Sequence, residues 1–103
     1  MKTTFSKYDV TEYLKTPEQM AQYLDACIEE SSGDAALIAK ALGDIARAQG
    51  MSNIAKSSGL SRESLYKSLS GERAPDFATV LKVMKSLGLK LHAEVAVESV
   101  LTN

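Results

Sequence analysis

The chain has 103 residues, 45% of them hydrophobic and 24% charged, and its formal net charge at pH 7 is −1. This length provides one modest hydrophobic core, so we expect a single domain over residues 1–103. The charge excludes a protein that coats nucleic acid indiscriminately, and the lack of a signal-peptide pattern or a long apolar run predicts a cytoplasmic protein with no membrane span.

The sequence offers few residues for metal or covalent chemistry. Cysteine and histidine occur once each, as Cys27 and His92, so neither an internal disulfide nor a zinc cluster is expected. Cys27 falls at a core-facing helical position, where a small buried hydrophobe is expected rather than a reactive thiol. His92 has no reason to lie near a nucleophile. We therefore expect no metal, no cofactor and no enzymatic activity.

The charges are unevenly distributed along the chain. Residues 1–30 contain three lysines and six acidic residues, whereas residues 31–75 contain six basic and four acidic residues. A basic middle behind an acidic front suggests two surfaces with different partners. The alternative is that a spread of this size is ordinary in a soluble domain.

A first helix is predicted over residues 17–30. Thr16 can cap it, Pro17 suits its first position, and Gln19 can close a capping box with Thr16. Its apolar face consists of Met20, Tyr23, Leu24, Cys27 and Ile28. Ahead of it lies an arm whose apolar and amphipathic residues have no clear period, namely Tyr8, Val10, Tyr13 and Leu14. Such an arm can pack against its own core, which we favour, or against a partner.

A second helix is predicted from its cap Asp34 to Gln49, with Gly50 closing its end. Its apolar face consists of Leu37, Ile38, Ala41, Leu42, Ile45 and Ala46. Gly43 lies inside this helix, where it costs about 1 kcal/mol relative to alanine but permits a close contact with another helix.

The stretch MSNIAKSSGLSRESLYKSLSG, residues 51–71, has the pattern of a helix-turn-helix. A short helix is predicted over residues 52–58 and a second over residues 61–70. Gly59 and Gly71 follow these helices, and glycine readily takes the left-handed conformation that ends a helix.

The predicted second helix of this motif has an apolar and a polar face. Leu65 and Leu69 fall one turn apart and can anchor it, while Leu60 fills the turn and Ala55 permits a close helix crossing. Arginine can bind a guanine edge through two hydrogen bonds and glutamate can accept one from cytosine, so the polar face suits a DNA major groove. The residues predicted to bind DNA are Ser52, Asn53, Ser61, Arg62, Glu63, Ser64, Lys67 and Arg73.

A fifth helix is predicted between its cap Asp76 and Gly88. Its expected apolar face is Phe77, Val80, Leu81, Met84 and Leu87. Five short helices sharing an apolar centre indicate an all-α bundle. We divide the chain into an arm with the first helix (1–33), a helix-turn-helix bundle (34–88) and a tail (89–98).

The tail has the period of a half-buried β-strand rather than of a helix. Apolar residues occupy alternate positions, namely Leu89, Leu91, Ala93, Val95 and Val97. A lone strand leaves its backbone groups unpaired, so the second strand must come from another copy of the chain or from a partner. A frayed helix or an irregular tail is the alternative.

The arrangement of Ala55, Gly59 and Leu65 resembles that of phage-repressor-like DNA-binding domains. More broadly, residues 42–91 resemble the addiction-module antidote proteins, HigA-like antitoxins with a repressor-type domain, and residues 8–30 are similar to the N-terminal segment of that family. The resemblance therefore covers nearly the whole chain.

This resemblance implies an all-α, five-helix repressor-like DNA-binding domain, to which the tail adds a short C-terminal β-strand. One departure from the helix-turn-helix pattern is Ser68, where an apolar residue is usual. We expect Leu69 to supply that packing instead.

The resemblance also implies function: an antitoxin of a type II toxin-antitoxin module that neutralises a RelE/HigB-like toxin and represses transcription from operator DNA, as a homodimer. Such toxins cleave messenger RNA, so their clefts favour anions, and the acidic arm suggests partner contacts at Tyr8, Asp9, Glu12 and Tyr13. Two alternatives stay open: a stand-alone transcription regulator without a toxin, and a protein-binding adaptor that has lost DNA binding.

Overall fold

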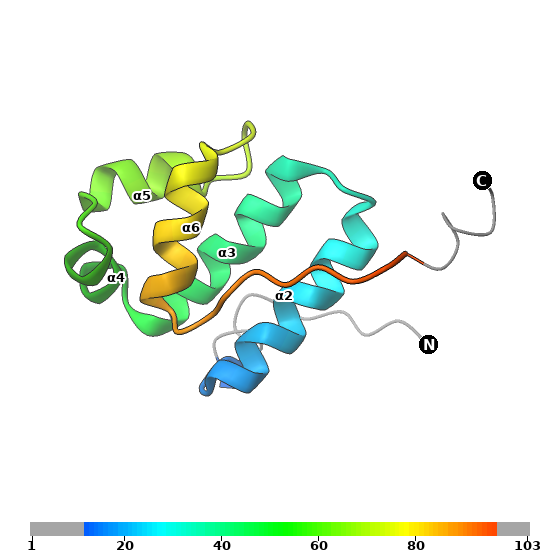
Figure 1. Cartoon of the computed structure of the whole chain (residues 1–103). Helices are drawn as coiled ribbons and strands as arrows, with labels where there is room; N and C mark the ends of the chain where they lie inside the picture. Colours follow the sequence, from blue (N-terminus) through cyan, green and yellow to red (C-terminus); the bar gives the residue numbers. More distant parts are fainter. Residues whose placement is uncertain (1–11, 97–103) are drawn as a thin grey trace.

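Five helices lie wholly within residues 12–96, the part of the chain that the computed structural model describes (Figure 1). They are α2 (Pro17–Ser31), α3 (Ala35–Gln49), α4 (Met51–Ser58), α5 (Arg62–Ser68) and α6 (Phe77–Ser86). Residues 1–11 and 97–103 lie outside this part. The prediction of an all-α fold is confirmed for the described residues. The helices lie where the sequence predicts them, although α5 ends at Ser68 rather than Ser70.

Local hydrogen bonds fix where the first two of these helices begin. Thr16 Oγ1 accepts from the amide of Gln19 at 3.2 Å, and the Gln19 side chain accepts from the amide of Thr16 at 3.1 Å, which confirms the predicted capping box. Asp34 Oδ1 accepts from the amide of Ala36 at 3.0 Å and so caps α3. These side chains bind amides that have no partner within the helix.

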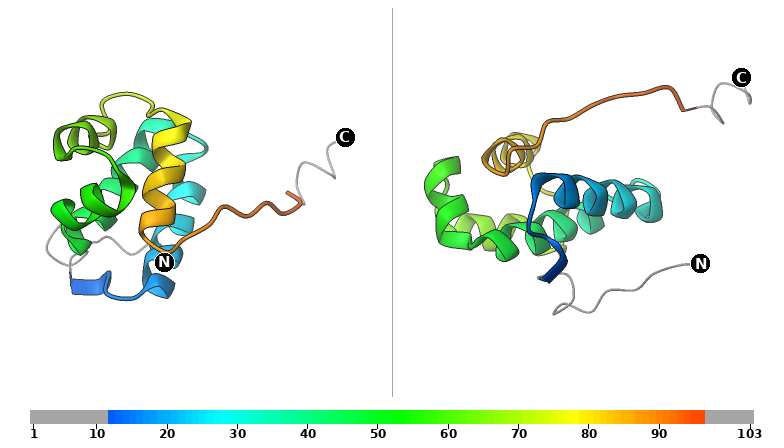
Figure 2. Two further views of the ribbon diagram at one scale, coloured as in Figure 1. Left: turned by 60° about the vertical axis from the view of Figure 1, so that its left-hand side comes forward. Right: turned by 90° about the horizontal axis from the view of Figure 1, so that it is seen from below.

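Helix α3 is the centre of the arrangement, because it contacts α2, α4, α5 and α6. Figures 1 and 2 show α2 beside α3, with α4 and α5 on the other side of α3 from α2. Side chains from the segment before α2 and from all five of these helices meet in one hydrophobic core. Its largest fully buried side chains are Leu14, Leu42, Ile45, Leu65, Leu69 and Val83.

The segment before α2 packs on this core, as favoured from the sequence. Leu14 is only 1% exposed, and its carbonyl oxygen accepts a hydrogen bond of 3.0 Å from Gln49 Nε2. Tyr13 packs partly against the core and donates to Gln22 Oε1 at 2.9 Å. The arm therefore contributes to folding where it is described.

Some predicted core positions are wrong, because the buried arc of each helix is narrower or rotated. In α6, Phe77 and Leu81 are exposed while Val83 is fully buried, so the buried face of this helix is centred near Val83 rather than on the predicted apolar face. Leu37 of α3 and Ile28 of α2 are also exposed. Helical spacing locates an apolar stripe, but only the neighbouring helices decide how much of the stripe they cover.

The predicted C-terminal strand is not present in the described part of the tail. Residues 89–96 follow α6 without forming a helix or a strand, and Figures 1 and 2 show them running from the end of α6 past α2 and beyond the helices. A strand requires a neighbour for its backbone hydrogen bonds, and residues 12–96 provide none. Val97 lies outside the described residues.

None of the described helices has both the length and the apolar character needed to cross a bilayer.

Candidate nucleic-acid interface

Helices α4 and α5 are joined by a tight turn at the predicted place. Gly59 has a φ of 79°, in the left-handed region, and its amide donates to the Ala55 carbonyl at 3.0 Å. The Leu60 amide donates to the same carbonyl at 3.2 Å. Ala55 and Leu60 both pack partly against the core, as expected for the small residue at the crossing and the plug of the turn.

The inner side of α5 is fixed by two leucines. Leu65 and Leu69 are 0% and 1% exposed. Ser68 is only half-buried, so Leu69, the residue that caps α5, supplies the packing that Ser68 does not. The hydroxyl of Ser61 accepts from the amide of Ser64 at 3.0 Å and caps the start of α5. This anchoring holds the opposite face of α5 outward.

Interior packing also sets the position of the end of α5. A Cβ built on Gly43 would lie 2.6 Å from the backbone oxygen of Leu69, closer than real Cβ atoms approach. The close helix contact predicted from Gly43 is therefore confirmed, and α3 acts as the platform on which α5 rests.

All eight residues predicted to bind DNA are exposed in the structure. Five of them lie on α5 or at its cap, two lie near the start of α4, and Arg73 lies in the loop after α5. Asn53 Nδ2 donates to the Gln49 carbonyl at 3.3 Å, and the Ser61 hydroxyl is engaged as a cap, so these two side chains also have local structural roles.

Arg62 has a partner that sequence reasoning missed. Its guanidinium carbon lies 5.7 Å from the ring centroid of Tyr66, and its Nη2 donates to the Tyr66 hydroxyl at 3.4 Å. The two residues are one helical turn apart, and a cation above an aromatic ring is attracted to it. The spacing of the two residues could have indicated this pair, which restricts Arg62 on the exposed face of α5.

Lys40 of α3 was also missed. A Cβ built on Gly71 would lie 3.0 Å from the Lys40 Cβ, so the loop after α5 runs directly beside this exposed lysine. Lys40 and Arg73 come from distant parts of the sequence, and no local pattern relates them. A phosphate near the end of α5 would meet positive charge from two segments.

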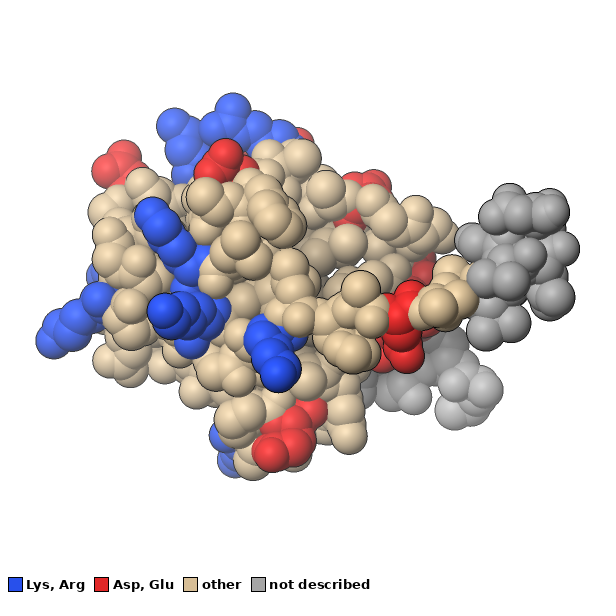
Figure 3. Space-filling view, viewed as in Figure 1, with Lys and Arg blue, Asp and Glu red and all other residues tan. Residues whose placement is uncertain are grey.

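Within the described residues the charges divide at a different place from the one read from the sequence, which put the acidic front at residues 1–30 and the basic stretch at residues 31–75. Residues 51–90, which include α4, α5 and α6, carry seven basic and three acidic residues, whereas residues 12–50 carry three basic and seven acidic residues. Figure 3 shows most of the visible Lys and Arg side chains over α4, α5, α6 and the adjoining loops. A polyanion would be attracted to this part of the molecule.

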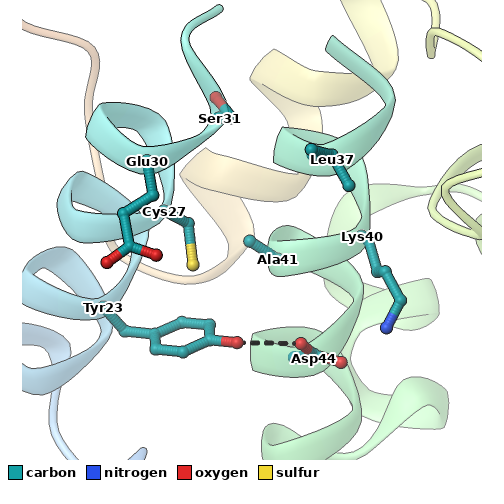
Figure 4. A pocket seen from close by; sticks show the side chains of 8 residues that line it. All are labelled: Tyr23, Cys27, Glu30, Ser31, Leu37, Lys40, Ala41 and Asp44. Atoms are coloured by element: carbon teal, nitrogen blue, oxygen red, sulfur yellow. Dashed lines mark hydrogen bonds between the residues drawn. The ribbon is translucent and has the colours of Figure 1, made fainter. Parts of the chain in front are cut away.

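A hollow of about 270 Å³ lies between α2 and α3, lined by both polar and apolar side chains (Figure 4). Tyr23 donates to Asp44 Oδ2 at 2.9 Å, and Asp44 Oδ1 accepts from Arg47 at 2.7 Å. Burial, followed by the Asp44 carboxylate, raises the pKa of Tyr23 well above its ordinary value. Burial also raises the pKa of Cys27, which favours the neutral thiol and the predicted packing role.

The Tyr23–Asp44 hydrogen bond predicts a pH dependence of stability. Because the folded pKa of Tyr23 is raised, its contribution is complete below the unfolded pKa of about 10 and is lost as the pH rises above that value. We expect Tyr23→Phe to lower the free energy of unfolding at pH 8. Between pH 8 and pH 10.5, the free energy of unfolding should then fall less in this variant than in the wild type. Urea unfolding at both pH values measures this. Equal losses of unfolding free energy in the two proteins would show that Tyr23 does not cause the pH dependence. The control is Tyr66→Phe, because Tyr66 lies on α5, on the far side of the core.

Of the four predicted partner-binding residues, the structure describes Glu12 and Tyr13. Tyr8 and Asp9 lie outside the described residues. Glu12 is exposed and lies 3.7 Å from Lys15 Nζ, an exposed ion pair of small energetic value. Tyr13 lies on the same short segment, partly packed against the core.

Residues 12–96 define a small helical fold with an outward polar helix, a basic part and an acidic part. The chain belongs to the family described as "Probable addiction module antidote protein", whose family model matches residues 4–95. It is also similar to an uncharacterized protein of Haemophilus influenzae, with 49% identity over 87 residues. This alignment covers 84% of this chain and 88% of that protein. No solved structure matches the chain. The antidote family implies a cognate toxin as partner.

Proposed function

We propose that the protein is the antitoxin of a type II toxin-antitoxin module that binds operator DNA as a homodimeric repressor and neutralises a RelE/HigB-like toxin. The observation that carries the DNA-binding part is the exposed polar face of α5, held outward by Leu65 and Leu69. The toxin-binding part is supported by the antidote family.

Helix α5 has the chemistry of a helix that reads DNA. Its first turn contains Arg62 and Glu63, which can bind base edges in a major groove. Lys67 follows on α5, and Lys40 and Arg73 lie beyond the end of this helix, where they can contact phosphates. This division separates residues that select a sequence from those that attract any DNA.

The acidic part of the molecule suits a different partner. An RNA-cleaving toxin has a cleft that attracts anions, and residues 12–50 carry an excess of four negative charges. Toxin and DNA would then bind different parts of the same chain.

Coexpression with a neighbouring reading frame for a small basic protein, followed by copurification, tests the toxin partner. Binding to DNA from the shared promoter, measured across salt concentrations, tests the repressor. A specific operator complex whose affinity falls with salt supports DNA binding. Copurification without any DNA binding would leave only a protein-binding adaptor, and operator binding without a toxin would leave a stand-alone regulator.

The acidic arm gives a prediction for the toxin. We expect Asp9→Lys combined with Glu12→Lys to slow association with the toxin by about tenfold at low salt, because opposite charges accelerate encounter. Stopped-flow or surface-based kinetics at low and high salt measure this. Glu72→Lys with Asp76→Lys makes the same change in net charge on exposed residues elsewhere and is the matched control. An equal rate for the two double variants would exclude the arm as the neutralising surface.

A further inference from the structure

The tail is an extended segment without backbone partners. The Leu89 amide donates to the Met84 carbonyl at 2.8 Å, and beyond it the backbone groups of residues 90–96 make no hydrogen bond with any described residue. The side chains of residues 90–96 are all exposed. Such a segment can form a strand as soon as a second extended chain lies beside it.

The tail also borders an apolar groove of about 470 Å³. The groove lies between α2, α3, α6 and the tail, and its apolar lining includes Leu24, Ile28, Ile38, Met84, Leu89 and Leu91. The tail also lines it with the polar residues Lys90, His92 and Glu94. Ile28 and Leu91 remain 40% and 51% exposed. Two paired strands alone are only marginally stable, but here a two-stranded ribbon would lie against the helices that border the groove.

We propose that this groove and tail bind the same tail of a second copy, so that residues 89–95 of the two chains pair antiparallel about a two-fold axis at His92. The proposal rests on the homodimer of the proposed function and specifies where its interface lies. A two-fold axis brings the same segment of each chain together in opposite directions, as an antiparallel pair requires.

The charges of the tail select this register. With the axis at His92, Lys90 lies opposite Glu94 of the second copy, and this pair occurs twice. On the other face, Leu89 lies opposite Val95 and Leu91 opposite Ala93, so apolar residues meet apolar residues. Opposite charges directly across an antiparallel pair stabilise it, and like charges destabilise it.

Neighbouring registers are less complementary. An axis at Leu91 would place Lys90 opposite His92, and an axis at Ala93 would place Lys90 opposite Ala96, which leaves its charge without a partner. An axis midway between two neighbouring residues would place apolar residues opposite polar ones, because side chains alternate between the two faces of a strand.

Sedimentation of the full-length chain and its charge variants tests the interface. We expect a wild-type dimer, and about a tenfold higher dissociation constant for either Lys90→Glu or Glu94→Lys, because each places two like-charged pairs in contact. The double variant restores opposite pairs and should regain most of the affinity. Equal dimerisation of all four proteins would overturn the register, as would a double variant weaker than both single variants.

A cross-link tests the position of the axis independently. In a Cys27→Ser background, which removes the only native cysteine, His92→Cys should form a disulfide-linked dimer under mild oxidation. Glu94→Cys is the control, because four residues along a strand would separate it from its symmetry mate by about 14 Å. Cross-linking at residue 94 but not at residue 92 would overturn the proposal.

Two variants, one at Ile28 and one at Leu81, test the groove, because these two side chains are exposed to a similar extent. Ile28→Ser should weaken the dimer, whereas Leu81→Ser should not, because Ile28 lines the groove and Leu81, 43% exposed, does not. A monomeric wild type at tens of micromolar would overturn the interface without affecting the toxin-binding proposal, which copurification reads separately. If the variants left dimerisation unchanged but weakened toxin binding, the tail would pair with the toxin rather than with a second copy.

Discussion

Replacing Gly43 with alanine is expected to lower the free energy of unfolding by about 1–3 kcal/mol, although glycine to alanine inside a helix ordinarily gains about 1 kcal/mol. The added Cβ would lie 2.6 Å from the backbone oxygen of Leu69, and a backbone atom cannot move aside as a flexible side chain can. The end of α5 must shift instead. Urea unfolding measures the loss, and operator binding reports the displaced helix.

Gly59→Ala separates this clash from ordinary backbone strain. Gly59 has a φ of 79° and nothing within 4 Å of a built Cβ, so its replacement should cost only the left-handed strain of about 1–2 kcal/mol. It also lies in the turn before α5. If Gly43→Ala were stabilising, α3 and α5 would not be in the close contact described.

The helix positions could be predicted because their signals are local. Thr16 with Gln19 and Asp34 specify helix starts through side-chain hydrogen bonds to neighbouring amides. Gly50 and Gly59 are also local signals, because each ends a helix with backbone angles that other residues rarely adopt. Such signals require no knowledge of which helices pack together.

Contacts between distant segments could not be predicted. Asp44 follows the helical pattern of a solvent-facing residue, yet it accepts a hydrogen bond from Tyr23 of another helix. Lys40 lies beside Gly71 only because α3 supports the end of α5. The exposure of Phe77 and Leu81 depends likewise on which side of α6 its neighbours cover.

The tail shows a third limit. Alternation from Leu89 to Val97 predicted a β-strand, and residues 89–96 form none, because a strand is a property of two segments and the described chain contains one. On α5, the exposed face was predicted from the anchors Leu65 and Leu69, whereas the Arg62–Tyr66 pair was not. The DNA-binding role of that face stays a prediction.

Separate effects are expected for the two basic residues of α5. If Arg62 binds a base edge, Arg62→Ala should cost roughly 1–3 kcal/mol of binding and relax the preference at one base pair. Lys67→Ala should weaken binding to all sequences alike and lower the salt slope by about one, because it removes a phosphate contact. Binding across an operator library at several salt concentrations measures both.

Two further variants show whether geometry or charge matters at residue 62. Arg62→Lys keeps the positive charge but loses the planar fork that forms two parallel hydrogen bonds, so it should relax specificity almost as much as alanine while retaining the salt slope. Tyr66→Leu keeps an apolar residue of helical propensity but removes the ring beneath the guanidinium, 5.7 Å away, and should reduce discrimination without abolishing binding. Unchanged specificity in Arg62→Ala, with circular dichroism showing an intact fold, would exclude α5 as the helix that reads the operator.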